Sequence, residues 1–281
     1  MAPLREVLVG FDSAWADNPR NPGAVAACVL DAGRCVAFHP PRLARFAEAA
    51  RFVAEVGCGA DAVLVAIDQP TVVANETGSR PIDRVAASLV SRLRGGVQPA
   101  RRGGTGAAMF GDGAPIWRFL DAIGAAQDPL AARGAASGRF VMEVFPALAL
   151  PEIVPAIWAR RRSAKYNPAA RLFLASDWPL VASGVAAFAR GLGAEALAEW
   201  ADAAAGLDRP RKADQDRLDA AICVAIALAW RHGPATATLQ LGDARSGLMA
   251  TIASGEVRAV LVAAAERLGV AVDGVPAVAQ P

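Results

Sequence analysis

An uninterrupted apolar run in the first quarter of the chain constrains the fold more than any other feature. Residues 61–67 read DAVLVAI, and Asp68-Gln69-Pro70 follows at once. A run this short and this apolar is typical of a strand buried on both faces of a sheet, and the proline ends its hydrogen bonding. Such strands occur where helices cover both sides of a sheet, so we expect an α/β protein.

Further segments predict strands and helices around this run. Apolar runs predict strands at Glu6–Asp12, Ala24–Leu30, Cys35–His39, Arg139–Val144 and Leu248–Ile252. Apolar residues at helical spacing predict helices at Phe46–Val56, Arg80–Arg94 and Asp214–Trp230. The stretch 95–113 is rich in glycine and arginine, which indicates a mobile loop, and 151–206 has the pattern of a helical insertion. No linker divides the chain, so we expect one domain over 1–281.

Composition narrows the classes of protein that the chain can be. Hydrophobic residues make up 54% of its 281 residues and the net charge is +2, which is typical of a globular protein with no general attraction to nucleic acid or membrane. The four cysteines are scattered without a C-x-x-C pair, which argues against a zinc site. Charged residues near the start argue against a secretion signal, and no apolar run approaches the length of a membrane helix. We therefore expect a cytoplasmic protein with no membrane partner.

Acidic residues stand at the ends of three apolar runs and at the start of the last long helix. Asp12, Asp68 and Glu143 close or follow predicted strands, and Asp216 and Asp219 lie three apart on one helical face. Functional groups in α/β sheets collect at the carboxyl ends of parallel strands, so these acids can meet. Clustered carboxylates repel one another unless a cation lies between them, and Mg²⁺ or Mn²⁺ prefers such oxygen ligands. The alternative is that each acid is only a turn former or a helix cap.

Several short motifs resemble one family in their order and spacing. The series GFDSAW, AIDQP, RPIDR, EVFPALALP, KYNPAAR and QDRLDAAICVAIALA is similar to the predicted RNase H-like nucleases grouped as domain of unknown function 429, from about Val7 to Leu248. The D-x-x-D-A pattern of Asp216 and Asp219 also resembles the last catalytic segment of RuvC-type Holliday-junction resolvases.

The resemblance implies an RNase H-like fold, with a mixed five-stranded sheet whose first three strands are antiparallel and which helices flank. It implies that Asp12, Asp68 and Asp219 hold the metal ion. Asp216 would assist from the closing helix, and Glu143 would lie nearby on the fifth strand as a further catalytic carboxylate.

Basic and polar groups near these acids are candidates for binding substrate. Arg80 and Arg84 lie four apart after Asp68, where arginines can grip phosphate. Lys165 and Tyr166 offer a phosphate contact and a stacking ring, although a sole tyrosine is equally explained by core packing. Gln69, beside Asp68, completes the predicted substrate-binding set, with nucleic acid or a small phosphorylated molecule as the partner.

Three functions compete at this point. The first is a metal-dependent nuclease or phosphodiesterase, in which carboxylate-bound Mg²⁺ activates water. The second is a phosphotransferase of the actin and sugar-kinase superfamily, but the turn Asp12-Ser13-Ala14-Trp15 lacks the glycine of a phosphate loop and the length suits one domain. The third is a non-catalytic protein that uses the same fold to bind a ligand or a partner. The sequence predicts no oligomeric state.

Overall fold

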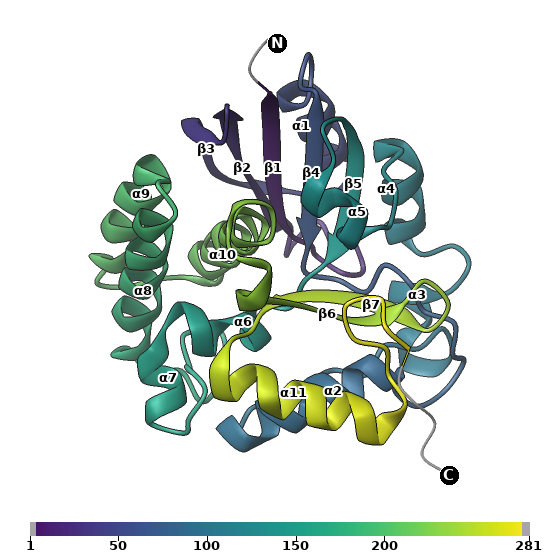
Figure 1. The fold of residues 1–281 in the computed structure, drawn as a ribbon. Coiled ribbons are helices and arrows are strands. Elements are labelled where there is room, and N and C mark those ends of the chain that lie inside the picture. The colour runs from purple at the N-terminus through teal and green to yellow at the C-terminus, as the bar shows by residue number, and fades with distance from the viewer. Residues whose placement is uncertain (1–3, 277–281) are drawn as a thin grey trace.

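A mixed five-stranded sheet forms the centre of the protein. The computed structural model describes residues 4–276. The strands of this sheet are β1 (Arg5–Asp12), β2 (Gly23–Asp31), β3 (Arg34–Ala44), β4 (Ala62–Ile67) and β5 (Gly138–Glu143). Their order across the sheet is β3-β2-β1-β4-β5 (Figure 1). The first three strands pair antiparallel, whereas β1, β4 and β5 run parallel. The predicted α/β class, the mixed sheet and all five strands are confirmed.

Helices occupy most of the remaining chain. Those before the fifth strand are α1 (Phe46–Val56), α2 (Pro81–Val90), η1 (Ser91–Leu93), η2 (Gly104–Gly106), α3 (Ala107–Phe110), α4 (Pro115–Ile123) and α5 (Pro129–Gly134). Those after it are α6 (Pro146–Ile153), α7 (Pro155–Ala159), α8 (Asp177–Gly191), α9 (Glu195–Ala205), α10 (Lys212–His232), η3 (Ala235–Ala237) and α11 (Gly255–Leu268). The helices predicted at 46–56, 80–94 and 214–230 correspond to α1, to α2 with η1, and to α10. Among the described residues, no helix is both long and apolar enough to cross a membrane.

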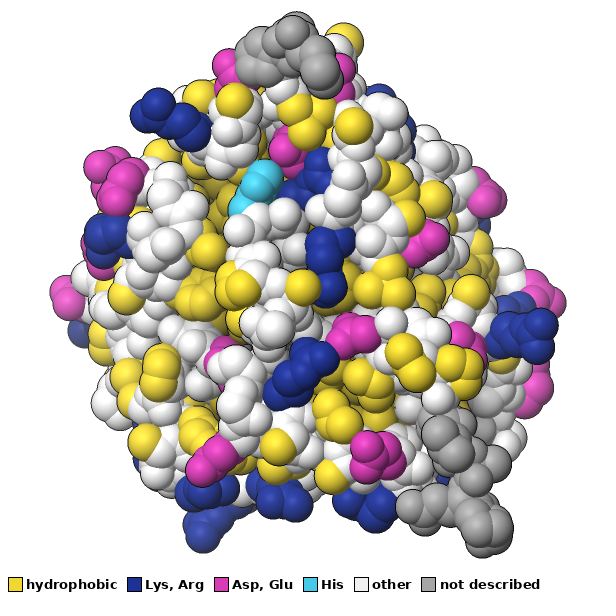
Figure 2. Space-filling view, in the orientation of Figure 1, with side chains coloured by type: hydrophobic (Ala, Val, Ile, Leu, Met, Phe, Trp, Pro, Cys, Tyr) yellow, Lys and Arg dark blue, Asp and Glu magenta, His cyan; other side chains and the backbone are white. Residues whose placement is uncertain are grey.

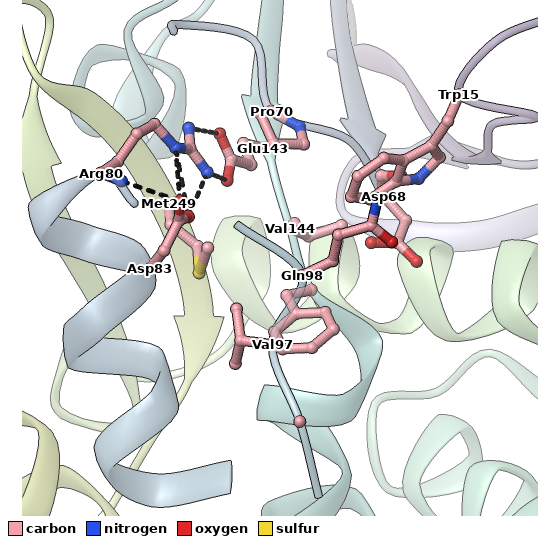
Figure 3. A pocket seen from close by; sticks show the side chains of 12 residues that line it. Trp15, Asp68, Pro70, Arg80, Asp83, Val97, Gln98, Glu143, Val144 and Met249 are labelled. Atoms are coloured by element: carbon pink, nitrogen blue, oxygen red, sulfur yellow. Dashed lines mark hydrogen bonds and ion pairs between the residues drawn. The ribbon is translucent and has the colours of Figure 1, made fainter. Parts of the chain in front are cut away.

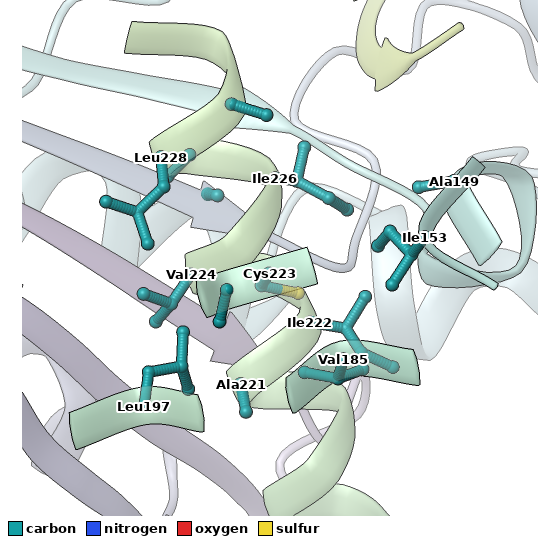
Figure 4. Packing of buried hydrophobic residues seen from close by; sticks show 14 of the residues in the cluster. Ala149, Ile153, Val185, Leu197, Ala221, Ile222, Cys223, Val224, Ile226 and Leu228 are labelled. Atoms are coloured by element: carbon teal, nitrogen blue, oxygen red, sulfur yellow. The ribbon is translucent and has the colours of Figure 1, made fainter. Parts of the chain in front are cut away.

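Side chains on the central strands alternate between two helical layers. On β1, Val7, Val9 and Phe11 belong to the core that contains residues of α1 and α4. Leu8 belongs to the opposite core, which contains α10 and residues of α6, α8 and α9 (Figure 4). Because successive side chains of a strand point to opposite faces of the sheet, the position of an acid at a strand end decides whether it faces α10 or the layer of α1 and α4.

The long helix α10 lies directly against β1 because one strand position lacks a side chain. A Cβ atom added at Gly10 would lie 2.2 Å from the backbone oxygen of Ala220 and 2.5 Å from the backbone nitrogen of Val224. Gly10 is therefore required by close packing of the helix backbone on the strand. The contact fixes where the first turns of α10, which carry Asp216 and Asp219, stand relative to the end of β1.

A smaller layer packs below the carboxyl ends of the parallel strands in Figure 1. It contains an antiparallel pair, β6 (Thr238–Asp243) and β7 (Gly247–Ile252), together with α2 and α11. A bridge between Val144 and Ala250 joins this layer to the end of β5. The short late strand predicted at 248–252 is confirmed as β7, but its partner β6 and the helix α11 were not predicted.

The segment predicted as a loop at 95–113 is partly helical. It contains η2 and α3, and the side chain of Phe110 is fully buried in a small cluster with Val73 and Ala100. The prediction of a stretch without secondary structure is therefore wrong for its second half. The reason is that one buried aromatic ring anchors this half to the turn after β4, which overrides the local glycine content.

Candidate functional site

The site begins where two neighbouring parallel strands end. Asp12 is the last residue of β1 and Asp68 is the first residue after β4. The register pairs Phe11 with Ile67, so the two acids that follow are neighbours across the sheet. Asp12 shares the strand face of Leu8 and Gly10, and Asp68 shares that of Leu64 in the same core. Alternation along both strands thus directs both carboxyls toward α10.

The helix α10 brings two further acids to the same place. Asp216 and Asp219 lie in its first two turns, and their side chains are buried, with relative exposures of 6% and 5%. Asp12 is equally buried at 8%. The carboxylates predicted to form a metal site from distant segments are therefore close enough to affect one another's ionisation, as their pKa values show below.

The acids on α10 are held by hydrogen bonds, whereas those on the strands are open. Tyr166 donates its hydroxyl proton to Asp219 Oδ1 at 2.5 Å, and the side-chain nitrogen of Gln215 donates to Asp219 Oδ2. The ammonium of Lys212 forms an ion pair with Asp216. Between residues 4 and 276 no donor bonds to the side-chain oxygens of Asp12 or Asp68, and Asp68 accepts hydrogen bonds only through its backbone oxygen. The two strand acids are thus the ones with free ligand atoms.

Burial and mutual repulsion disfavour negative charge in this cluster. Burial, followed by repulsion from Asp219, raises the pKa values of Asp12 and Asp68 well above their usual range. Burial also raises the pKa of Asp219 to about 7, although the hydrogen bond from Tyr166 and the charge of Lys212 act to lower it. When ionised, the four carboxylates would carry more negative charge than the ammonium of Lys212 balances. A bound cation would reduce the repulsion among them.

The donor set suits a hard divalent cation even though the side chains are not arranged as a closed cage. No group of three or more His, Cys, Asp or Glu side chains within residues 4–276 is placed to hold a metal ion. Mg²⁺, however, keeps several of its waters and is usually bound by one or two carboxylates together with substrate phosphate. The open oxygens of Asp12 and Asp68 meet that requirement, with Asp219 held beside them.

Glu143, predicted as a further catalytic carboxylate, is engaged by arginine, although its charge still contributes to raising the pKa of Asp68. Arg80 donates two hydrogen bonds to it, Nη2 to Oε1 at 2.6 Å and Nη1 to Oε2 at 2.7 Å, and also pairs with Asp83. All three side chains are buried (Figure 3). The sheet register explains why Glu143 does not join the acids near α10. Glu143 is paired with Ile67, so its side chain leaves the sheet on the same face as that of Ile67, whereas the side chain of Asp68, one residue later, leaves it on the other face.

The predicted substrate-binding residues divide in the same way. Arg80 forms buried ion pairs with Asp83 and Glu143. Arg84, by contrast, is exposed on the next turn of α2 and has no ion-pair partner among residues 4–276. Lys165 is half-buried and donates from Nζ to the backbone oxygen of Arg94 at 3.3 Å. Gln69 is fully buried, and its amide bonds to the turn after β1, with 2.5 Å between its oxygen and the hydroxyl of Ser13. In this structure Gln69 positions that turn and offers no atom to a substrate.

Sequence reasoning missed the role of Trp15 at the rim of the site. Its indole nitrogen donates to the backbone oxygen of Asp68 at 3.0 Å. Its backbone φ is +49°, a conformation that is rare for bulky residues and costs about 1–3 kcal/mol. The surrounding structure therefore forces this ring into place beside Asp68. The only signal in the sequence was its position within the turn after a strand that ends in an acid.

A cavity adjoins the carboxylate cluster at Asp68. It has a volume of about 240 Å³ and extends from Asp68 to the buried Arg80–Glu143 cluster (Figure 3). Its walls are mostly apolar and include Trp15 and Met249. The protein thus combines an acidic centre at the ends of parallel strands with a small pocket that opens next to it.

These features define the class of the protein: an α/β protein whose parallel strand ends and closing helix gather a buried carboxylate cluster. The chain belongs to the family described as "Protein of unknown function (DUF429)", whose model matches residues 10–242. The match includes every acid of the cluster. No curated protein and no solved structure matches the chain.

Proposed function

We propose that the protein is a metal-dependent nuclease or phosphodiesterase with an RNase H-like fold. The observation that carries the proposal is a pair of carboxylates at the ends of adjacent parallel strands, the buried Asp12 and the partly buried Asp68, with Asp219 beside them. The strand order β3-β2-β1-β4-β5, with three antiparallel strands first and a long helix across them, supports the finer fold assignment. Membership of the family itself carries no activity.

Each residue of the carboxylate cluster has a distinct role in the proposed hydrolysis. Asp12 and Asp68 would hold Mg²⁺ or Mn²⁺, which when bound supplies a polarised water and charge stabilisation for a phosphodiester. Asp219, whose pKa is about 7, is suited to take up or release a proton near neutral pH. Tyr166 fixes the orientation of that carboxyl through its hydrogen bond. Asp216, paired with Lys212, keeps the ammonium near the site.

Basic segments beside the site support a phosphate-bearing substrate. The backbone nitrogen of Ser163 donates to the oxygen of Leu93, and Lys165 reaches Arg94, so the arginine-rich stretches 92–102 and 160–165 meet. Figure 2 shows further basic side chains along the lower edge of the face, where α11 lies in front of α2. Such a rim is suited to nucleic acid or a small phosphorylated molecule. All four cysteines are free thiols, which supports a cytoplasmic setting as part of the proposal.

The proposal is tested by hydrolysis of a labelled panel in Mg²⁺ or Mn²⁺. The panel contains single strands, duplexes, an RNA–DNA hybrid, a four-way junction and a small phosphodiester. Asp12→Asn removes one of the open carboxylates, and Asp121→Asn, at an exposed position on α4, is the matched control. We expect cleavage that requires metal, that is lost in Asp12→Asn and that is kept in Asp121→Asn. Activity that persists in Asp12→Asn or without metal would contradict the proposal.

One observation favours the alternative of a non-catalytic binding protein. The two acids on α10 are already engaged, Asp216 by Lys212 and Asp219 by Tyr166 and Gln215. These two acids therefore have hydrogen-bonding or ionic partners within the protein itself. Binding of panel members by a folded protein that cleaves none of them, in either metal, would support this function instead.

A further inference from the structure

We propose that the cavity beside Asp68 is a subsite for one unpaired nucleobase of the substrate. The inference rests on the proposed function and names the substrate class more closely. The cavity begins at Asp68, one of the two open carboxylates, so a group bound in it has its attached sugar phosphate next to the acidic centre. Because of this position, the cavity would receive the part of the substrate that lies next to the reacting phosphate.

The cavity is large enough for one nucleobase but not for a base pair. Its volume of about 240 Å³ lies below the roughly 300–1,000 Å³ that is usual for pockets that enclose drug-sized ligands. A base that is paired with its complement could not enter. The substrate must therefore present an unpaired base, as a single strand, a loop, a junction or a free nucleotide does.

The walls suit the flat faces of a base. Trp15 lies at the Asp68 end of the cavity (Figure 3), and Val97, Phe145 and Met249 are among the other apolar residues that line it. The indole nitrogen of Trp15 is already bonded to the backbone of Asp68, so the residue offers its ring and not a donor. A ring whose orientation is fixed in advance loses little freedom when a base stacks on it.

Polar groups at the edge of the cavity suit the rim of a base. The side chain of Gln98 lines the cavity, and its amide nitrogen makes only a 3.8 Å contact with the sulfur of Met109. An amide presents both a donor and an acceptor, which matches the mixed edge of a nucleobase. At the far end the guanidinium of Arg80 is balanced by Glu143 and Asp83, so that end offers no free positive charge to a second phosphate. The cavity therefore suits a base more than a phosphate group.

The test measures binding without metal, so that it is independent of catalysis. Nucleoside 5′-monophosphates and a short homopolymeric DNA strand are titrated into the full chain by calorimetry in EDTA, with ribose 5-phosphate as the baseless control. Val97→Trp fills the cavity from its loop wall, and Gln98→Ala removes the polar edge without adding bulk. Val36→Trp, at a position on β3 that is 61% exposed, is the matched control for the added ring.

We expect at least one nucleotide to bind wild type and Val36→Trp equally, while ribose 5-phosphate does not bind at the same concentration. Val97→Trp should weaken binding roughly 5- to 100-fold, as expected for the loss of one stacked base. Gln98→Ala should change the preference among bases. Equal binding by Val97→Trp and wild type, or equal binding of ribose 5-phosphate and nucleotides, would overturn the inference. Loss of cleavage in the hydrolysis panel with base binding intact would count against the proposed catalysis and not against the subsite.

Discussion

The raised pKa of Asp219 predicts that the metal-free protein becomes less stable as pH rises toward neutrality. In the folded protein this carboxyl keeps its proton up to a pH of about 7, whereas its ordinary value is 3.8. Between these values the folded state binds a proton that the unfolded state has released. Stability must therefore fall with increasing pH across that window and level off above it. The shifts of Asp12 and Asp68 have the same sign and act in the same direction.

The size of the effect follows from the same values. The difference between 3.8 and about 7, at about 1.36 kcal/mol for each pKa unit, corresponds to about 4 kcal/mol. Because the carboxyls of the cluster titrate together, this figure belongs to the group and not to Asp219 alone. It is a large part of the roughly 5–15 kcal/mol by which domains are usually stable.

Urea unfolding in EDTA between pH 4 and pH 8 measures this dependence. We expect the free energy of unfolding of the wild type to fall over that range. That of Asp219→Asn should fall less, because the variant lacks one titrating carboxyl and the repulsion that this carboxyl exerts on Asp12 and Asp68. Added Mg²⁺ should restore more stability at pH 8 than at pH 5, since metal and proton compete for the same oxygens. A wild-type curve that is flat or rises between pH 4 and pH 7 would refute the reasoning, as would an Asp219→Asn curve with the wild-type slope.

Three further predictions concern the surroundings of the site. Glu143→Gln should cost about 1–3 kcal/mol in urea unfolding, because the buried guanidinium of Arg80 loses a charged hydrogen-bond acceptor while Asp83 still balances its charge; the absence of any measurable cost would contradict this account of the ion cluster. Gly10→Ala should lower the unfolding temperature sharply or prevent folding, since the added methyl meets the backbone of α10, whereas Gly96→Ala has nothing within 4 Å and should be nearly neutral. Tyr166→Phe should raise the pKa of Asp219 above about 7, because the hydrogen bond that lowers it is lost; carboxyl NMR titration checks this, and an unchanged titration would show that the hydroxyl does not bond there.

Much of the fold could be predicted because its signals are local. A fully apolar run identified β4, helical spacing identified α1 and α10, and two further apolar runs identified β2 and β3. The helix α11 is buried on one side only, and the strand β6 mixes polar residues with its apolar ones although all but its last residue is buried. Both pack against elements distant in the sequence. Their place depends on the smaller layer as a whole, which local periodicity does not encode.

The candidate site was predictable to the extent that it depends on strand ends. Asp12 and Asp68 could be expected to be neighbours because each ends or follows a parallel strand, and the register of the two strands brings them side by side. Glu143 also closes a strand, yet it faces the other way, because one residue of register decides the face and the sequence does not fix the register between β4 and β5. The burial of Gln69 could not be predicted for a similar reason, because a polar residue beside an acid gives no indication of which of the two is buried.

The close packing of α10 on β1 has a consequence for how the protein is made. The ribosome completes all five strands of the central sheet before it synthesises the helix that covers one of their faces. At about 5–20 residues per second, the stretch from Glu143 to Lys212 takes several seconds to emerge. During that interval the apolar side chains meant for α10 have no cover, so the nascent chain is open to aggregation and to capture by chaperones. A chain that stops before Lys212 would accumulate as an insoluble product and not as a folded protein that merely lacks two acids.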